Sequence, residues 1–329
     1  MMKIGLSIPH EPSLALTLMK QCGVEHAVSH QSLQPIDGAS DDEQPWTLTS
    51  LAKRKQAHED LGFELAVIEG RPAMEKIKLA LPGRDAEIDV VCQMLINMGK
   101  LGIPVSCSMW MPILGVMRSS RALPTRAGAT VSSSDLSQVE EGLTERGVVS
   151  EEEQWENLQY FLEHTVPVAE EAGVKMAMHP DDPPLSPIRG MARIMSSLDN
   201  YQCMLDMVPS PMNGIALCQG NFGLMTDDLP AAIRYFGGQG KIHFVHLRDV
   251  RGNRTTFRRL SMMTASTIWP SVCAPTGMPV STASVVLITI RVWATSPSTM
   301  ICAWLGSSSL GYIKGLHQAV YSEPTAAVS

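Results

Sequence analysis

The chain has 329 residues, a net charge of −7, 44% hydrophobic residues and 18% charged residues. This composition is typical of a globular protein with one large α/β domain or two smaller ones, and the acidic balance argues against nucleic acid as the main partner. Seven scattered cysteines indicate free thiols in a reducing, cytoplasmic setting. We find no signal-peptide pattern at the start and no apolar run of membrane-spanning length before residue 250, so no membrane association is expected.

Strands and helices alternate along the first two-thirds of the chain. Apolar residues recur at helical spacing over 86–101, and Ser150 precedes three glutamates that suit a helix N-terminus. This alternation indicates an α/β fold with a parallel sheet, and about eight such units favour a closed barrel. The expected elements are 3–7, 25–29, 46–61, 63–69, 86–101, 103–109, 150–172, 174–179, 189–198, 202–206, 214–218, 229–236 and 241–247.

Two segments interrupt this alternation within what we expect to be a single barrel domain, 1–329. Residues 114–149 are rich in Ser, Arg, Thr and Gly and follow a strand, so they are expected to form a lid-like loop at the barrel mouth. Residues 258–309 contain no Asp or Glu, and no helix can be traced there. An ordinary amphipathic pattern returns at 312–321, which predicts a C-terminal helix.

Three of the expected strands end in a side chain that binds metals. His179, Cys218 and His246 each stand at the carboxyl end of an apolar strand, where an α/β barrel carries its chemistry. Imidazole and thiolate are metal ligands of soft to borderline character, so the three together indicate a metal site. Taken singly, a strand-end histidine is more often structural, and a cysteine is often a small buried apolar residue. His243 points to the opposite face from His246, which favours a structural or supporting role.

Six short motifs follow one another in an order that resembles bacterial mannonate dehydratases. They are Val-Ile-Glu at 67–69, Ile-Lys-Leu-Ala-Leu-Pro-Gly-Arg-Asp at 77–85, Met-Pro at 111–112, His-Pro-Asp-Asp-Pro-Pro at 179–184, Cys-Gln-Gly at 218–220 and His-Leu-Arg-Asp-Val-Arg-Gly at 246–252. The resemblance covers residues 1 to about 256 and again the last helix. It implies a TIM (β/α)8 barrel that uses Mn²⁺ or Fe²⁺ to dehydrate D-mannonate to 2-keto-3-deoxy-D-gluconate in hexuronate catabolism.

The resemblance also implies roles for individual residues. His179, Cys218 and His246 would be the metal ligands. The partner would be a small-molecule sugar acid, for which Arg118 and Arg248 are candidate carboxylate-binding residues. Glu69, at the end of its strand, is a candidate substrate-binding or supporting residue, with a merely solvated side chain as the alternative. Assembly into a homo-oligomer is left open.

One motif of the family is missing from the chain. The family carries a fourth ligand, an Asp, beside a catalytic His in a C-terminal Arg-Pro-Asp-His motif, which this sequence lacks. Met262 and Met263 must be encoded ATG ATG, and the codon of Thr264 begins AC; read one nucleotide earlier, these bases give an uncertain first residue followed by two Asp residues. With permissive codons, the same shift across 285–291 can read Arg-Pro-Asp-His-Asp-Pro. We therefore expect 257–311 to be a frameshifted segment that disrupts the last βα unit.

Two alternatives to an active mannonate dehydratase follow from that gap. The chain could be the non-catalytic product of a damaged gene. It could also be another divalent-metal barrel, such as a sugar isomerase, although that chemistry favours a carboxylate-rich metal site, and the three candidate ligands include no carboxylate.

Overall fold

Eight parallel strands close into a barrel in the computed structural model, which describes residues 3–8, 11–125, 130–260, 287–290, 311 and 314–315. The order around the barrel is β1-β12-β9-β8-β7-β4-β3-β2, and every neighbouring pair is parallel. The predicted TIM barrel is thus confirmed. The strands are β1 (Lys3–Ser7), β2 (His26–Ser29), β3 (Glu64–Ile68), β4 (Val105–Met109), β7 (Lys175–His179), β8 (Asn213–Cys218), β9 (Ile242–Leu247) and β12 (Leu287–Ile290).

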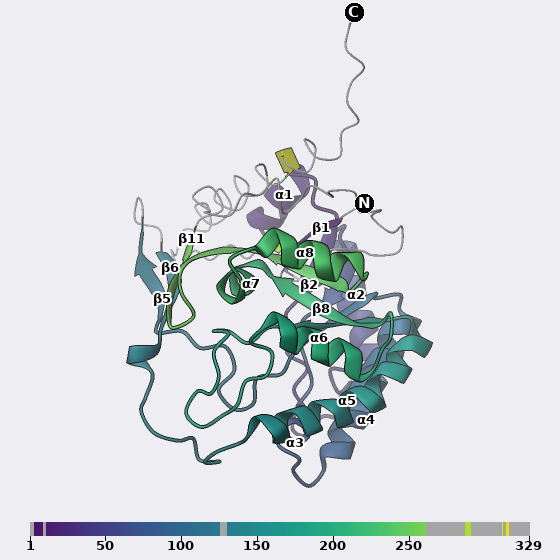
Figure 1. Cartoon of the computed structure of the whole chain (residues 1–329). Coiled ribbons are helices and arrows are strands. Elements are labelled where there is room, and N and C mark those ends of the chain that lie inside the picture. The colour runs from purple at the N-terminus through teal and green to yellow at the C-terminus, as the bar shows by residue number, and fades with distance from the viewer. Residues whose placement is uncertain are drawn as a thin grey trace, which may run out of the picture.

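Helices cover the outside of the barrel, and Figure 1 shows α4 and α5 side by side on one flank. The longest helix, α5, begins where Ser150 and Glu153 form a capping box and ends at Gly173, whose φ is 68°. The helices are α1 (Leu14–Gln21), α2 (Leu48–Asp60), α3 (Glu75–Lys78), α4 (Arg84–Lys100), α5 (Glu151–Ala172), α6 (Leu198–Met207), α7 (Gln219–Met225) and α8 (Leu229–Gly238). Two short 3₁₀ turns, Asp41–Glu43 and Leu136–Gln138, are also present.

One part of the predicted alternation differs from the structure. The separate elements expected over 189–198 and 202–206 are instead a loop followed by the single helix α6. The helix begins here because the Ser197 side chain accepts a hydrogen bond from the backbone N–H of Asn200, and Asp199 lies in the first turn. A local cap therefore determines a boundary that apolar spacing alone placed wrongly.

A second, antiparallel sheet stands beside the barrel, at the left of Figure 1. Its order is β10-β11-β6-β5. Two of its strands come from segment 114–149, expected to be a lid-like loop, and the other two follow β9 directly; any movement of this segment as a lid stays a prediction. The strands are β5 (Ser120–Pro124), β6 (Thr130–Asp135), β10 (Asp249–Gly252) and β11 (Thr256–Leu260).

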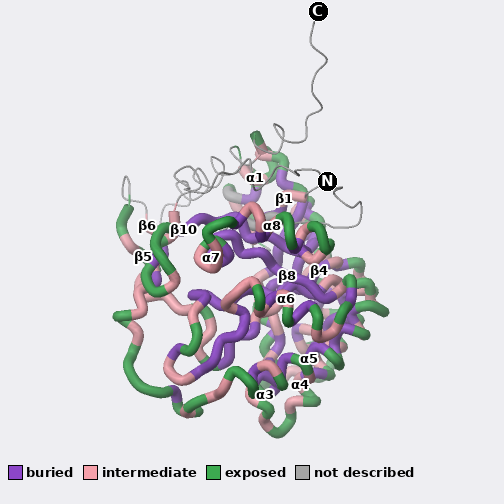
Figure 2. Tube along the Cα trace, in the orientation of Figure 1, coloured by how far each residue is buried: buried purple, intermediate pink, exposed green. Residues whose placement is uncertain are grey.

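The barrel strands form the buried centre of the molecule, with exposed residues on the outer faces of helices such as α4 and α5 (Figure 2). Small apolar side chains and one large ring, Phe244, fill the barrel interior. Outside this layer, His243 is fully buried between strands, and its Nδ1 hydrogen-bonds the Met176 carbonyl at 2.9 Å. These contacts agree with the structural role expected for His243 because it points to the opposite face of the strand from His246.

The ring of His243 fits only because residue 214 is a glycine. A Cβ at Gly214 would lie 2.3 Å from Cε1 of His243. We expect Gly214→Ala to lower the free energy of unfolding by about 1–3 kcal/mol, because the ring must leave its place in a packed core. Urea unfolding measures this, with Gly223→Ala as the control, because nothing lies within 4 Å of a Cβ there. An unchanged midpoint for Gly214→Ala would contradict the packing described.

Most of the expected frameshifted segment 257–311 lies outside the described residues. Its first four residues complete β11, where Phe257 is buried, and β12 pairs with β1 and β9. Of the expected helix 312–321, Lys314 and Gly315 are described and are helical, and the Lys314 ammonium donates to the Cys22 carbonyl at 2.7 Å. Among the residues that the structure describes, no helix is long and apolar enough to cross a membrane.

Candidate metal centre

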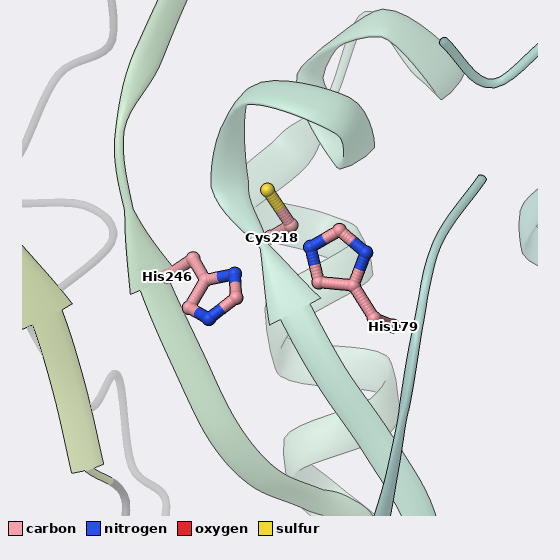
Figure 3. Close-up of side chains that lie close together, drawn as sticks. All are labelled: His179, Cys218 and His246. Carbon is pink, nitrogen blue, oxygen red and sulfur yellow. The ribbon is translucent and has the colours of Figure 1, made fainter. Parts of the chain in front are cut away.

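Three ligand-type side chains converge at the carboxyl ends of adjacent barrel strands. His179 ends β7, Cys218 ends β8, and His246 lies near the end of β9, directly opposite Cys218 in the strand register. Their ligand atoms all lie within 4.8 Å of one another, and all three residues are buried. Figure 3 shows the sulfur of Cys218 above the gap between the two imidazole rings. Two atoms bound to one ion at about 2.0–2.3 Å lie at most about 4.6 Å apart, so small side-chain shifts bring all three within bonding distance of one ion.

The surroundings favour the forms of these residues that bind metals. Burial lowers the pKa of His179 to about 4, so its imidazole is neutral at pH 7. Its Nδ1 lies 2.7 Å from the Pro180 carbonyl, which leaves Nε2 to face Cys218 and His246 (Figure 3). Burial alone would raise the pKa of the Cys218 thiol, but the Arg248 charge and the contact with His246 outweigh it, so the pKa is lowered. A lowered thiol pKa favours the thiolate, the form that binds metals.

The buried His243 predicts a dependence of stability on pH. Burial lowers its pKa from 6.5 to about 4, so the unfolded chain binds this proton more tightly than the folded one. Its contribution is complete above pH 6.5 and is lost as the pH falls toward 4, by about 3 kcal/mol in all. Urea unfolding of the metal-free protein at several pH values measures how the free energy of unfolding changes with pH. In this window, the change should correspond to about one proton fewer in His243→Gln than in the unaltered chain. The exposed His164→Gln variant is the control, and equal slopes in all three proteins would contradict the assignment.

A carboxylate holds both arginines that were expected to bind a substrate. Asp182 accepts two hydrogen bonds from Arg118, at 2.8 and 2.5 Å, and one from Arg248 at 3.0 Å. Burial would raise the pKa of Asp182, but the two guanidinium groups hold it well below its usual range. The Arg248 guanidinium also bonds the side chain of Asn221. The structure therefore brings Arg118 and Arg248 together beside the metal-ligand cluster, and their substrate role stays a prediction.

A cavity of about 140 Å³ opens between the metal-ligand cluster and the small sheet. His179 and His246 line it on the barrel side, together with Glu69. The residues on the other side come mainly from segment 114–149 and the small sheet, and they include Val116, Arg118, Arg121, Ser132 and Arg259. Four arginines and two carboxylates face the cavity, since Arg248 and Asp182 line it as well. Such a surface suits an anionic ligand.

Sequence reasoning missed two features of this region. His30 directly follows β2, and its Nε2 lies 3.3 Å from the Glu69 carboxylate; it repeats the pattern of a strand followed by a histidine, which could have revealed it. Asp182 was not assigned a role of its own, because the arginines that hold it lie 64 and 66 residues away. No local pattern carries that information.

Fold and cluster together define a TIM-barrel protein with a candidate metal centre at its mouth. A family model described as D-mannonate dehydratase (UxuA) matches residues 8–148 and 132–267, which is more than half of the chain. The chain belongs to the D-mannonate dehydratase family. The second match ends inside segment 257–311.

Individual relatives agree with this assignment. Mannonate dehydratase of Thermotoga neapolitana is 36% identical over an alignment of 239 residues, and the match covers 63% of this chain and 66% of that protein. Mannonate dehydratase 2 of Halalkalibacterium halodurans is 36% identical over an alignment of 233 residues, and the match covers 63% of this chain and 67% of that protein. The chain thus matches about two thirds of the length of these relatives.

Solved structures give the same picture of the fold. The crystal structure of mannonate dehydratase from Streptococcus suis serotype 2 has a TM-score of 0.81 and 26% identity, and the match covers 100% of this chain and 98% of that one. A xylose isomerase domain protein from Planctomyces limnophilus has a TM-score of 0.59 at 12% identity, with 97% and 98% covered. The second likeness concerns the fold alone.

Proposed function

We propose that this chain derives from an enzyme that removes water from D-mannonate to give 2-keto-3-deoxy-D-gluconate, in cytoplasmic hexuronate catabolism. The observation that carries the proposal is the buried cluster of His179, Cys218 and His246, whose ligand atoms lie within 4.8 Å of one another. It lies at the barrel mouth, beside an arginine-rich cavity, in a chain that belongs to the D-mannonate dehydratase family.

The residues of the cluster fit a divalent cation such as Mn²⁺ or Fe²⁺. His179 offers Nε2, because its other ring nitrogen is held by a carbonyl, and Cys218 offers a sulfur whose pKa is lowered. When bound, such an ion holds substrate oxygens and stabilises the negative charge that develops as the proton beside the carboxylate is removed. The three protein donors leave further coordination positions, which a substrate, water or a fourth protein ligand can take.

The cavity residues would bind a small acid that carries one negative charge. Arg118 and Arg248 share the single negative charge of Asp182, so this trio keeps a net positive charge that can attract the mannonate carboxylate. Without Arg259, which belongs to segment 257–311, arginines lining the cavity still outnumber carboxylates three to two. Glu69 lines the same cavity, which supports its proposed substrate-binding or supporting role.

The proton-transfer groups of the family are missing from the chain as written. The Asp and His of the Arg-Pro-Asp-His motif do not occur in its sequence, so we propose that segment 257–311 is frameshifted and that turnover is very low or absent. With the frameshift present, the chain is a metal-binding barrel without catalytic activity, the product of a damaged gene. The isomerase alternative receives no support from the cluster, whose three ligands include no carboxylate.

Binding of the sugar acid tests this function without requiring turnover. We expect calorimetric titration of the Mn²⁺-loaded protein to detect binding of D-mannonate but not of D-mannose, which lacks the carboxylate and cannot use the arginines. Elemental analysis of the same sample should give one Mn²⁺ per chain. Failure to bind the metal, or equal binding of acid and neutral sugar, would overturn the proposal.

A further inference from the structure

A buried carboxylate links two histidines at the mouth of the barrel. Glu69 directly follows β3, and its side chain is 3% exposed. Its Oε2 lies 3.2 Å from Nε2 of His246 and 3.3 Å from Nε2 of His30. The three residues follow or end different strands of the barrel, β2, β3 and β9, so the contacts connect a candidate metal ligand to the opposite side of the barrel mouth.

The contact with Glu69 determines which nitrogen of His246 is left for a metal. Nε2 of His246 is the atom that meets the carboxylate. Figure 3 shows the other ring nitrogen, Nδ1, on the side of Cys218, in agreement with the hydrogen bond between His246 and the thiol. In His179 the arrangement is reversed, because Nδ1 is held by the Pro180 carbonyl and Nε2 faces the cluster.

We propose that Glu69 is a positioning residue that makes His246 an Nδ1 ligand. A carboxylate only accepts hydrogen bonds, so Nε2 of His246 must carry the proton and Nδ1 keeps its lone pair for the ion. Nε2 of His30 lies 3.3 Å from the same carboxylate oxygen. The ligand set is then Nε2 of His179, Sγ of Cys218 and Nδ1 of His246. This inference rests on the metal binding in the proposed function and deepens it.

Direct ligation by Glu69 fits the structure less well. The group of ligand atoms within 4.8 Å of one another contains His179, Cys218 and His246 but not Glu69. In addition, Glu69 meets the nitrogen of His246 that points away from Cys218. A carboxylate behind the ring orients the imidazole and raises its basicity, and the loss of such a partner typically lowers metal affinity about 10–100-fold.

The chain offers a matched control on the same strand. Glu64 is the first residue of β3, whereas Glu69 directly follows the last residue of that strand. Oε2 of Glu64 lies 3.3 Å from Nδ1 of His26. This second carboxylate–histidine pair stands at the other end of the strand from the metal ligands. Replacing Glu64 removes a half-exposed carboxylate beside a histidine while leaving the barrel mouth unchanged.

The test compares Glu69→Ala with Glu64→Ala in two measurements. Chelator competition with Co²⁺ should show an affinity about 10–100-fold lower for Glu69→Ala, with one ion still bound per chain, and no change for Glu64→Ala. In the metal-free protein, ¹H–¹⁵N correlation spectra should show His246 protonated at Nε2, identified by the loss of its signals in His246→Asn. In Glu69→Ala, this tautomer should give way to a mixture.

Two outcomes would overturn the positioning role. One is an unchanged affinity together with an unchanged tautomer in Glu69→Ala. The other is a changed ligand-field spectrum of the bound Co²⁺ at saturating metal, which would make Glu69 a direct ligand. Because the tautomer is read without metal, the inference can fail while the proposed function stands. Absence of metal binding by the unaltered chain would instead overturn the proposed function.

Discussion

Restoring the reading frame across residues 257–311 is expected to raise the rate of D-mannonate dehydration by about 10²–10⁴-fold, the usual contribution of a positioned general acid or base. The reason is that the shifted frame can encode the Arg-Pro-Asp-His motif, which supplies the missing fourth ligand and proton-transfer group. The measurement is the rate at which the 2-keto-3-deoxy acid forms, with both proteins loaded with Mn²⁺.

The control for this comparison is the repaired chain with the Asp and His of the restored motif both replaced by Ala. That variant should return to the low rate of the chain as written, which separates the motif from a general gain in folding. Equal rates for the written and repaired chains would contradict both the frameshift and the role given to the motif. Resequencing the DNA across codons 255–312 shows directly whether the shift is present in the gene.

Replacing His179 or Cys218 by Ala is expected to remove most of the bound metal. Each change deletes one of three protein donors, and direct ligands contribute more than the outer partners whose loss already costs about 10–100-fold in affinity. Elemental analysis of Mn²⁺ in the purified variants measures the effect, and we expect less than one tenth of the metal found in the unaltered chain.

The matched control for the thiol is Cys203→Ser, since Cys203 is an exposed free cysteine on α6. For the imidazole, it is His164→Ala on the outer side of α5. Both controls should keep a full complement of metal. Unchanged metal content in His179→Ala and Cys218→Ala would show that the ligand assignment is wrong.

Sequence reasoning predicted correctly those features that local sequence patterns determine. Ser150 and its glutamates predicted the start of α5, and the structure has a capping box there. His179, Cys218 and His246 were grouped because each stands at a strand end, and parallel strands of a barrel carry these ends at one mouth. Their proximity in the structure follows from that topology.

The parts it missed depend on contacts between distant segments. The hydrogen bond between Glu69 and His246 joins residues 177 positions apart, and nothing near either residue indicates it. The small sheet pairs β6 with β11, where Thr256 and Asp135 are 121 positions apart. Within segment 114–149, β5 pairs with β6, but β6 takes its other partner, β11, from beyond β9.

The most direct test of the metal centre is anomalous diffraction at the manganese edge from crystals grown with Mn²⁺. We predict one strong peak at the barrel mouth, about 2.0–2.3 Å from Nε2 of His179, Sγ of Cys218 and a ring nitrogen of His246. A manganese peak elsewhere on the molecule, or Mn²⁺ bound in solution with no peak among these three residues, would contradict the site and the function proposed from it.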